Sequence, residues 1–238
     1  SNSGRIVATG LLARALEVER DFSREDNTGV APDQRTVVNS SGLFEASGAG
    51  AVALSFMHSN LEITETSVNL SEVPIGTVDL DLTATSIVRG GSGVEGAGIV
   101  FFGGERHTVR NAGLITADSG IAIVGGGAAE TIDNSGRIEG SVSLGAGDDR
   151  IISRGGVFTG ALDGGTGSDV LQIDVTTGSA TFADRFGGAI TGFEWFEKTG
   201  AGTFRMTSPV FSRIALRGGT LATQGDVGAM AVDAADGT

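Results

Sequence analysis

Three aspartates at glycine-rich corners are the residues with the clearest chemical potential in this sequence. Val142–Ile151 and Leu162–Ile173 each place glycines, then aspartate, then apolar residues, and the second segment fits the nine-residue calcium-binding pattern GGxGxDxUx. Carboxylate oxygens are the ligands that Ca²⁺ prefers, so Asp148, Asp149 and Asp169 predict a calcium site. The alternative is a set of solvated corners, because aspartate favours turns by bonding its own backbone.

Clustered acids also suit polysaccharide cleavage, which needs paired carboxyl groups at the scissile bond. Carbohydrate clefts usually carry exposed aromatic platforms, whereas this chain has no tyrosine and a single tryptophan. The patterns GxSxG and HExxH are both absent, and we expect His58 and His107 on the surface. We therefore expect no enzymatic activity and no catalytic residue. If the chain were a lyase or hydrolase, its active-site residues would come from the cluster Asp148, Asp149, Arg150, Arg154, Asp163 and Asp169.

A repeat runs through the middle of the chain and determines where these acids lie. Gly98, Gly120, Gly140 and Gly160 open successive units at intervals of 22, 20 and 20 residues. Each unit supplies an apolar position, a glycine-rich corner, an acid or histidine, and a second apolar position. The predicted columns are Val100, Ala122, Val142 and Leu162; His107, Glu130, Asp149 and Asp169; and Val109, Ile132, Ile151 and Leu171.

Alternation within each unit indicates short β-strands, because every second side chain of a strand lies on one face. Glycines interrupt any helical period every few residues. A unit this short cannot bury its own apolar face, so neighbouring units must stack, with equivalent residues about 4.8 Å apart. The sequence therefore predicts an all-β fold, a right-handed parallel β-helix with coils of about 20–24 residues. Trp195 is expected outside the regular coils, in a core or a cap.

Short Asn-x-Gly tags recur along the chain. Asn2, Asn111 and Asn134 begin the clearest copies, and Asn39 begins a variant with one extra residue. Stacked asparagines can hydrogen-bond along the axis of such a fold, so we expect these side chains in one column. The 72 residues from Asn39 to Asn111 predict three coils of 24, whereas the 37 residues from Asn2 to Asn39 are too many for one coil.

A polar excursion near residues 20–35 accounts for this surplus. Residues 15–22 alternate as a strand, which we favour over a short helix through residues 11–24. Loops that leave a rigid scaffold often carry specificity, so the excursion is our leading candidate for contact with a partner. An ordinary solvated loop is the alternative. The candidate binding residues are Arg24, Glu25, Asp26 and Asp33.

Composition restricts the partners. The chain has 238 residues, of which 39% are hydrophobic, with a net charge of −13 and no cysteine. This acidity argues against nucleic acid and against anionic membrane surfaces. No apolar run is long enough to span a bilayer, so we expect no membrane insertion by this chain, which reads as an excerpt of a longer protein. Cations, and neutral or cationic surfaces, are easier partners for a chain of this charge.

Two segments near the C-terminus carry a family resemblance. Lys198–Gly202 (KTGAG), followed by Gly218–Leu221 (GGTL), resembles the passenger-associated repeat of bacterial autotransporters. The Asn-Ser-Gly tags and the LGAGDD corner are also similar to passenger sequences. These resemblances cover most of residues 98–238. With the repeat described above, we expect β-helix coils over residues 1–185, with the loop excursion near 20–35, and the resemblance implies a passenger-associated repeat over 186–238 that continues the β-helix.

The same resemblance implies a passenger displayed on the surface of a Gram-negative bacterium through an outer-membrane translocator not included here. It implies a virulence-related adhesin, self-association between cells, or a stalk that presents another module. The partners that it implies are host or bacterial surface molecules, or another copy of the chain. Absence of cysteine suits a chain that crosses the periplasm before folding. The expected function is thus non-catalytic, with a carbohydrate-active enzyme or a calcium-stabilised repeat module as the alternatives.

Overall fold

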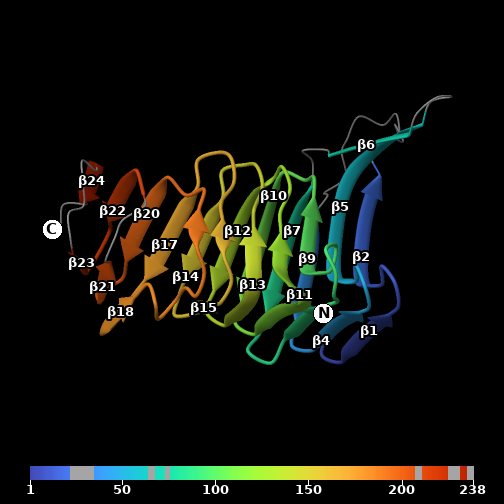
Figure 1. The fold of residues 1–238 in the computed structure, drawn as a ribbon, viewed down its shortest axis with the longest axis horizontal. Helices are drawn as coiled ribbons and strands as arrows, with labels where there is room; N and C mark the ends of the chain where they lie inside the picture. Colours follow the sequence, from blue (N-terminus) through green and yellow to red (C-terminus); the bar gives the residue numbers. More distant parts are fainter. Residues whose placement is uncertain (22–34, 64–67, 73–75, 207–210, 225–230, 235–238) are drawn as a thin grey trace.

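The computed structural model describes residues 1–21, 35–63, 68–72, 76–206, 211–224 and 231–234. Within these ranges the chain consists of strands, turns and irregular segments, and no apolar helix of membrane-spanning length is present. Successive coils stack into a long shaft that has the first strands at one end and the last strands at the other (Figure 1). The predicted parallel β-helix is confirmed.

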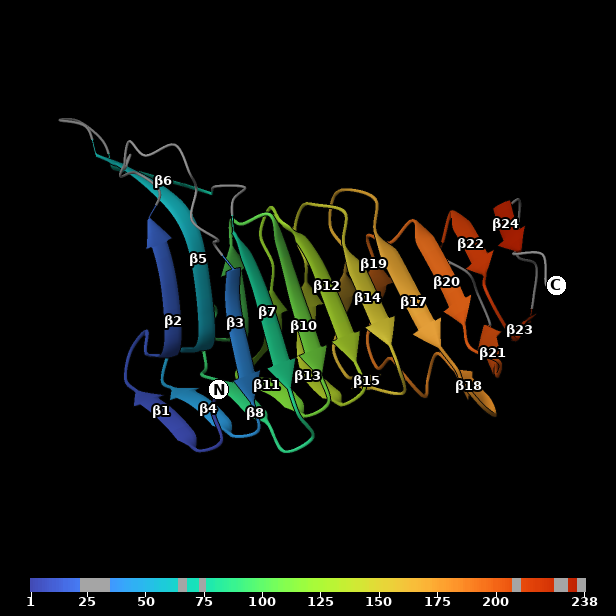
Figure 2. The same cartoon turned by 180° about the vertical axis from the view of Figure 1, so that it is seen from behind.

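One side of the shaft is a nine-stranded sheet that contains one strand from each coil, and Figure 2 shows this side. All of its strands run parallel, because each coil brings the chain back in the same direction. In chain order the strands are β3 (Arg35–Ser40), β7 (Thr77–Leu82), β10 (Arg106–Asn111), β12 (Ala129–Asn134), β14 (Arg150–Ser153), β17 (Val170–Asp174), β20 (Trp195–Thr199), β22 (Arg213–Leu216) and β24 (Ala231–Ala234).

The other side is a twelve-stranded sheet, and a three-stranded sheet extends the C-terminal end. The twelve strands are β1 (Arg5–Thr9), β2 (Arg14–Asp21), β4 (Leu43–Ser47), β5 (Val52–Ile63), β6 (Val68–Glu72), β8 (Ile87–Gly90), β9 (Ala97–Phe102), β11 (Leu114–Val124), β13 (Arg137–Ser143), β15 (Val157–Phe158), β16 (Leu162–Asp163) and β19 (Ile190–Thr191). The three strands are β18 (Ser179–Thr181), β21 (Thr203–Met206) and β23 (Thr220–Thr223).

Apolar ladders along the inside of the sheets form the core. Each ladder buries apolar area at every coil, which is the main stabilising force of a solenoid. The predicted column of Val109, Ile132, Ile151 and Leu171 is confirmed by the strand register. The same column extends to Leu80 and Phe196, and all six side chains are fully buried.

The first predicted column is only partly right. Val142 lies over Leu162 as expected, but the residue beneath Val142 is Ile123, which in turn pairs with Ile99. Val100 and Ala122 therefore do not belong to this column. The physical cause is a pair of register shifts in β11 between Thr116 and Ile123. An extra residue in a strand moves the side chains that follow it to the opposite face.

The asparagine ladder forms as predicted in the middle of the shaft. The side-chain amide of Asn111 donates to Oδ1 of Asn134 at 2.9 Å, and each Oδ1 also accepts the backbone N–H two residues on. The prediction for Asn39 is wrong, because Ser40 occupies that position and bridges to Asn2. The hydroxyl of Ser40 accepts the N–H of Gly42, which replaces the asparagine side chain.

The predicted number of N-terminal coils is also wrong. Ser40 pairs with Leu82, and Leu82 pairs with Asn111, so two coils and not three separate these tags. The surplus residues form the antiparallel hairpin of β5 and β6, which projects from the shaft in Figure 1. Asn2 pairs with Ser40, so the chain completes one coil between these two residues; residues 22–34 of the expected excursion lie outside the described residues. The expected strand after residue 14 is confirmed as β2, which pairs with β5.

The KTGAG and GGTL segments meet at one corner of the C-terminal coils. Lys198 is the only lysine of the chain and its side chain is fully buried in the structure. Its Nζ donates to the carbonyls of Thr199, of Gly200 at 2.7 Å and of Gly218 at 3.1 Å. A buried ammonium needs such acceptors. Lys198 therefore joins the two segments through backbone groups of consecutive coils.

The expected position of Trp195 is wrong. The residue is part of β20, where it pairs with Val170 and Arg213 inside the regular coils. It is half-buried, and the Arg213 guanidinium lies 4.7 Å from its ring centroid in a cation–π contact. Phenylalanines fill the core at this end instead.

Candidate functional site

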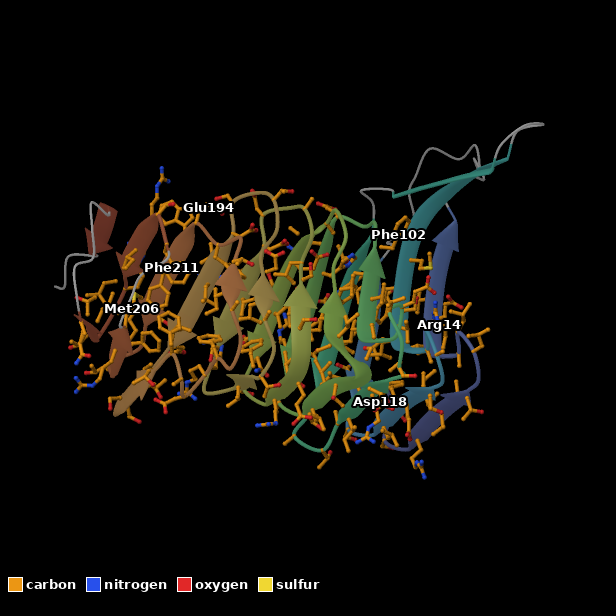
Figure 3. The ribbon with its side chains drawn as sticks, in the orientation of Figure 1. Arg14, Phe102, Asp118, Glu194, Met206 and Phe211 are labelled. Carbon is orange, nitrogen blue, oxygen red and sulfur yellow. The ribbon has the colours of Figure 1, made fainter. Side chains whose placement is uncertain are left out.

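A column of acids at one corner of the shaft is the most unusual chemical feature of the described residues. Glu130 lies over His107 in the register, and Asp149, Asp169 and Glu194 immediately precede the next three strands of the nine-stranded sheet. The predicted column of His107, Glu130, Asp149 and Asp169 is therefore confirmed. Figure 3 shows Glu194 at the upper edge of the shaft, the edge opposite to that of Asp118.

Three acids in the column, Asp149, Asp169 and Glu194, each accept a hydrogen bond from the backbone of the preceding coil. The N–H of Glu130 donates to Oδ1 of Asp149 at 2.7 Å, and the N–H of Asp149 donates to Oδ1 of Asp169 at 2.8 Å. The N–H of Asp169 donates in turn to Oε2 of Glu194 at 2.8 Å. The amides of Asp149 and Asp169 lie just before β14 and β17, and the pairing of β12 with β14 begins one residue after Glu130, so the carboxylates supply acceptors that the backbone of the next strand does not.

Glycines allow the corners to stack this closely. Gly165 and Gly167 both have positive φ, of 96° and 146°. A Cβ on Gly167 would lie 1.7 Å from the carbonyl oxygen of Gly147, and one on Gly165 would lie 1.8 Å from that of Gly145. Coil packing and backbone capping thus give the glycines and the aspartate of the GGxGxD pattern a structural role.

The acids differ sharply in exposure. The exposed fraction is 1% for Glu130, 1% for Asp149 and 0% for Asp169, so the alternative of solvated corners is wrong for Asp149 and Asp169. Asp148 is exposed, because adjacent residues in extended chain point to opposite sides, and its Oδ1 accepts the N–H of Ser168 at 2.9 Å. Asp148 therefore does not converge with Asp149 and Asp169.

Burial changes the acidity of these carboxyl groups. The pKa of Asp149 is raised from 3.8 to about 6, chiefly by loss of hydration and also by the negative charges of Asp169 and Asp148. The hydrogen bond from the Glu130 backbone acts in the opposite direction. Burial likewise raises the pKa of Asp169. The acids that add to this effect at Asp169 are Glu194, Asp148 and Asp163.

His107 lies at the end of this column, and the expectation that it is a surface residue is wrong. Its ring is fully buried and stacks on Phe101 with the centroids 4.7 Å apart. Nε2 donates to the carbonyl oxygen of Gly103 at 2.8 Å, which assigns the proton to that nitrogen. Burial lowers the pKa of His107. The side chain of His58 lies outside the described part.

The predicted calcium ligands do not form a cluster. Within the described ranges, no three His, Asp or Glu side chains are grouped so as to hold a metal ion. Calcium binding remains a prediction. The binding residues Arg24, Glu25, Asp26 and Asp33 all fall in the segment 22–34, which lies outside the described residues.

The residues named for a carbohydrate-active site are also spread apart. Arg150 reaches outward to Gln172 and Glu197. Asp163 is exposed and accepts the hydroxyl of Thr191 at 3.0 Å. Asp149 and Asp169 face inward at the corner, so no shared cleft brings the proposed acids and arginines together.

An ion-pair ladder on the outside of the nine-stranded sheet was not recognised from the sequence. Arginines and acids from different coils alternate along the shaft, and a surface hollow of about 240 Å³ lies among four of them, Asp81, Arg110, Asp133 and Arg154. The only sequence signal is a charge at outward-facing strand positions one coil apart. The pairs are Arg35–Asp79, Arg110–Asp79, Arg110–Asp81, Arg154–Asp133, Arg154–Asp174, Arg150–Glu197 and Arg217–Glu197.

Comparison with known proteins adds no family assignment. No protein-family model matches the chain, and neither a curated protein nor a solved structure shows significant similarity to it.

Proposed function

We propose that this chain is a non-catalytic β-helical shaft of a surface-displayed passenger, which acts through its long outer faces in adhesion or self-association. The observation that carries the proposal is the ion-pair ladder, which begins at Arg35 in β3 and continues to Arg217, next to β22. A rigid face with regularly repeated charges can make many weak contacts at once, and such contacts multiply when they are held in one body.

Charge in the ladder is balanced locally, although the chain as a whole is strongly acidic. Arg110 contacts both Asp79 and Asp81, and Arg154 contacts both Asp133 and Asp174. The arginines are about half exposed at their side chains, with values of 54% for Arg110 and 46% for Arg154. This face is therefore available to acidic or zwitterionic surface groups that the remainder of the protein repels.

Display outside a Gram-negative cell through a separate translocator belongs to the same proposal. It is supported by the resemblance of Lys198–Gly202 and Gly218–Leu221 to the passenger-associated repeat and by the absence of cysteine. The buried Lys198 gives that repeat a physical role as a link between coils.

The test is a bead assay with the purified chain. Fluorescent beads coated with the chain are mixed with each other and with bacterial or host cells, and clustering and cell attachment are counted. We expect attachment that falls at high salt and falls several-fold in the double variant Arg110→Ser/Arg154→Ser, because exposed charge contacts are screened by ions.

Arg5→Ser is the matched control, since Arg5 is an exposed arginine on the other sheet and pairs with Glu45. Absence of any attachment by the wild-type chain would reject adhesion and self-association and leave only a stalk. Attachment that is equal in all variants would reject the ladder as the contact face.

The segment 22–34 is tested separately. Replacement of residues 24–33 by a Gly-Ser stretch of the same length removes Arg24, Glu25, Asp26 and Asp33 while leaving the ladder intact. If these residues contact the partner, attachment falls in this variant as well, and its salt dependence becomes shallower.

A further inference from the structure

Another surface hollow adjoins the one that lies among the charges of the ion-pair ladder. It has a volume of about 220 Å³, and Arg154 belongs to the walls of both hollows. Its wall comes from the turn after β14, the turn after β17 and the segment between β18 and β19. The wall thus combines two guanidinium groups, one carboxylate and two hydroxyls. The residues that bear on its chemistry are Arg154, Gly155, Asp174, Thr176, Thr177 and Arg185.

Arg185 is held in place by the coils beside it. Its N–H donates to the carbonyl of Phe182 at 3.0 Å, and its own carbonyl accepts the N–H of Phe158 at 2.8 Å. The next residue, Phe186, is buried and stacks on Phe158 with the ring centroids 5.7 Å apart. The guanidinium is anchored as well, because Nη1 donates to the carbonyl oxygen of Gly155 at 2.5 Å. A side chain that is fixed before binding loses little conformational entropy when a ligand arrives.

The charge of Arg185 is not paired directly with an acid. Among the described residues, no carboxylate forms an ion pair with its guanidinium. The adjacent Asp184 interacts with Arg185 at longer range, while its Oδ2 accepts the N–H of Thr181 at 2.7 Å and the hydroxyl at 2.8 Å. Arg154, by contrast, is paired with two aspartates of the ladder. Arg185 is therefore the arginine of this hollow that retains its charge for a ligand.

The wall favours a ligand that carries one carboxylate among hydroxyls. A carboxylate fits the planar guanidinium fork through two parallel hydrogen bonds. Threonine hydroxyls donate and accept hydrogen bonds, as sugar hydroxyls do, and Thr176 and Thr177 are exposed. Asp174, in the same wall, opposes a doubly charged group such as a phosphate monoester. Pockets for drug-sized ligands measure about 300–1,000 Å³, so a hollow of about 220 Å³ accommodates one sugar unit.

We propose that this hollow binds one carboxylated sugar residue of a surface glycan, with the carboxylate on the guanidinium of Arg185 and the ring hydroxyls on Thr176 and Thr177. The ion pair takes the place of the aromatic platform that carbohydrate clefts usually carry. Because Arg154 joins this hollow to the ion-pair ladder, the bound glycan continues along the contact face. The proposal rests on the proposed adhesive function for its biological role, but sugar binding is measured without cells and is judged apart from adhesion.

The experiment follows the backbone amide NMR shifts of the purified wild-type chain at neutral pH while each of four probes is added separately. Methyl glucuronoside carries the carboxylate and the ring hydroxyls, and methyl glucoside has a hydroxymethyl group in place of the carboxylate. Inorganic sulfate is an anion without a sugar, and N-acetylglutamate α-amide carries its carboxylate on a peptide unit. We expect methyl glucuronoside to shift the amides of Gly155, Thr176 and Thr177, and to bind about tenfold more tightly than each of the other probes.

Variants test the two kinds of contact. Arg185→Gln removes the charge and should weaken the binding of methyl glucuronoside about tenfold. The matched control is Arg5→Gln, which removes the charge of an exposed arginine on the other sheet and should leave binding unchanged. Thr177→Val removes an exposed hydroxyl and should weaken binding about threefold. If Arg185→Gln fails to fold, the shifts of the wild type together with Thr177→Val decide the matter.

Several outcomes overturn the proposal. They are absence of binding by methyl glucuronoside, shifts centred away from the hollow, and unchanged binding in Arg185→Gln. Equal affinity for methyl glucoside removes the role of the carboxylate, equal affinity for sulfate leaves a bare anion site, and equal affinity for N-acetylglutamate α-amide assigns the hollow to acidic peptides. In all these cases the bead assay still decides the adhesive function. Absence of bead attachment with sugar binding intact would reject the adhesive function alone.

Discussion

The inner corner and the outer face of the shaft use the same residue type in opposite ways. On the outer face, Asp133 and Asp174 lie beside the guanidinium of Arg154, within reach of water. At the inner corner, Asp149 and Asp169 have backbone amides as partners and no basic side chain. The contrast indicates that outer acids contribute charge to a surface, whereas inner acids contribute acceptors to a backbone. The predictions below test this division, beginning with the largest effect.

Substitution of the corner glycine should cost most. In Gly167→Ala the new Cβ meets the carbonyl of Gly147 at 1.7 Å, at a φ of 146°. Because backbone must move to relieve the overlap, we expect a loss of about 3 kcal/mol in the free energy of unfolding, measured with urea. Gly120→Ala is the control, since it has a positive φ but no atom within 4 Å, and should cost about 1 kcal/mol.

Removal of the buried lysine should come next. Lys198→Ala leaves the carbonyls of Thr199, Gly200 and Gly218 without their common donor and opens a cavity. We expect a loss of about 2–3 kcal/mol, together with faster hydrogen exchange in β22 and β23. Lys198→Arg retains the charge but not the shape, and should recover only part of the loss. An unchanged unfolding midpoint in Lys198→Ala would show that water replaces the ammonium.

Removal of an inner acid should have an effect that depends on pH. Asp169→Ala leaves the N–H of Asp149 without an acceptor, which costs about 1–3 kcal/mol. At pH 8 the loss should be smaller than at pH 5, since deletion of a buried charge offsets part of it and the pKa of Asp169 is raised by burial. Thermal unfolding scans at both pH values measure the difference. A larger loss of stability at pH 8 than at pH 5 would contradict the view that Asp169 serves as a buried acceptor for the backbone.

Removal of an outer arginine should have the smallest effect on stability. Arg154→Ala breaks the contacts with Asp133 and Asp174, but exposed ion pairs contribute less than about 1 kcal/mol each. We expect a small shift of the urea midpoint that disappears at high salt. A loss above about 2 kcal/mol in the free energy of unfolding would show that the ion-pair ladder stabilises the fold, and it would weaken the assignment of the ladder as a contact face.

The regular coils in the middle of the shaft are the part of the fold that could be predicted from the sequence. Between Val109 and Leu171 the coil length is nearly constant, so counting residues places the core column correctly. The count fails at β11, where a local register shift leaves no trace in composition, and again at the β5–β6 hairpin, whose residues resemble another coil. Both cases depend on the pairing of strands that lie far apart in the sequence, and residue spacing alone does not reveal that pairing.

The acid column was predicted as a column but not as a buried one. Asp149 and Asp169 follow glycines and precede strands, and this context usually indicates a turn residue exposed to solvent. Their burial follows from the need of corner amides for acceptors, which becomes visible only when the coils are stacked. Glu194 was missed because its coil is longer: it lies 25 positions after Asp169, whereas Asp169 lies 20 positions after Asp149. The ion-pair ladder depends on which arginine side chains extend to acids of the neighbouring coils, and residue spacing does not reveal this.

The capping bonds of the acid column all point the same way along the shaft. The donor amide always belongs to the earlier coil, and the acceptor oxygen always belongs to the later one. Any cut between two of these coils would therefore leave unlike surfaces: bare amides on the piece before it and bare carboxylates on the piece after it. The stack therefore has a polarity along its axis, and a coil inserted in the reverse orientation would present the wrong group to both neighbouring coils.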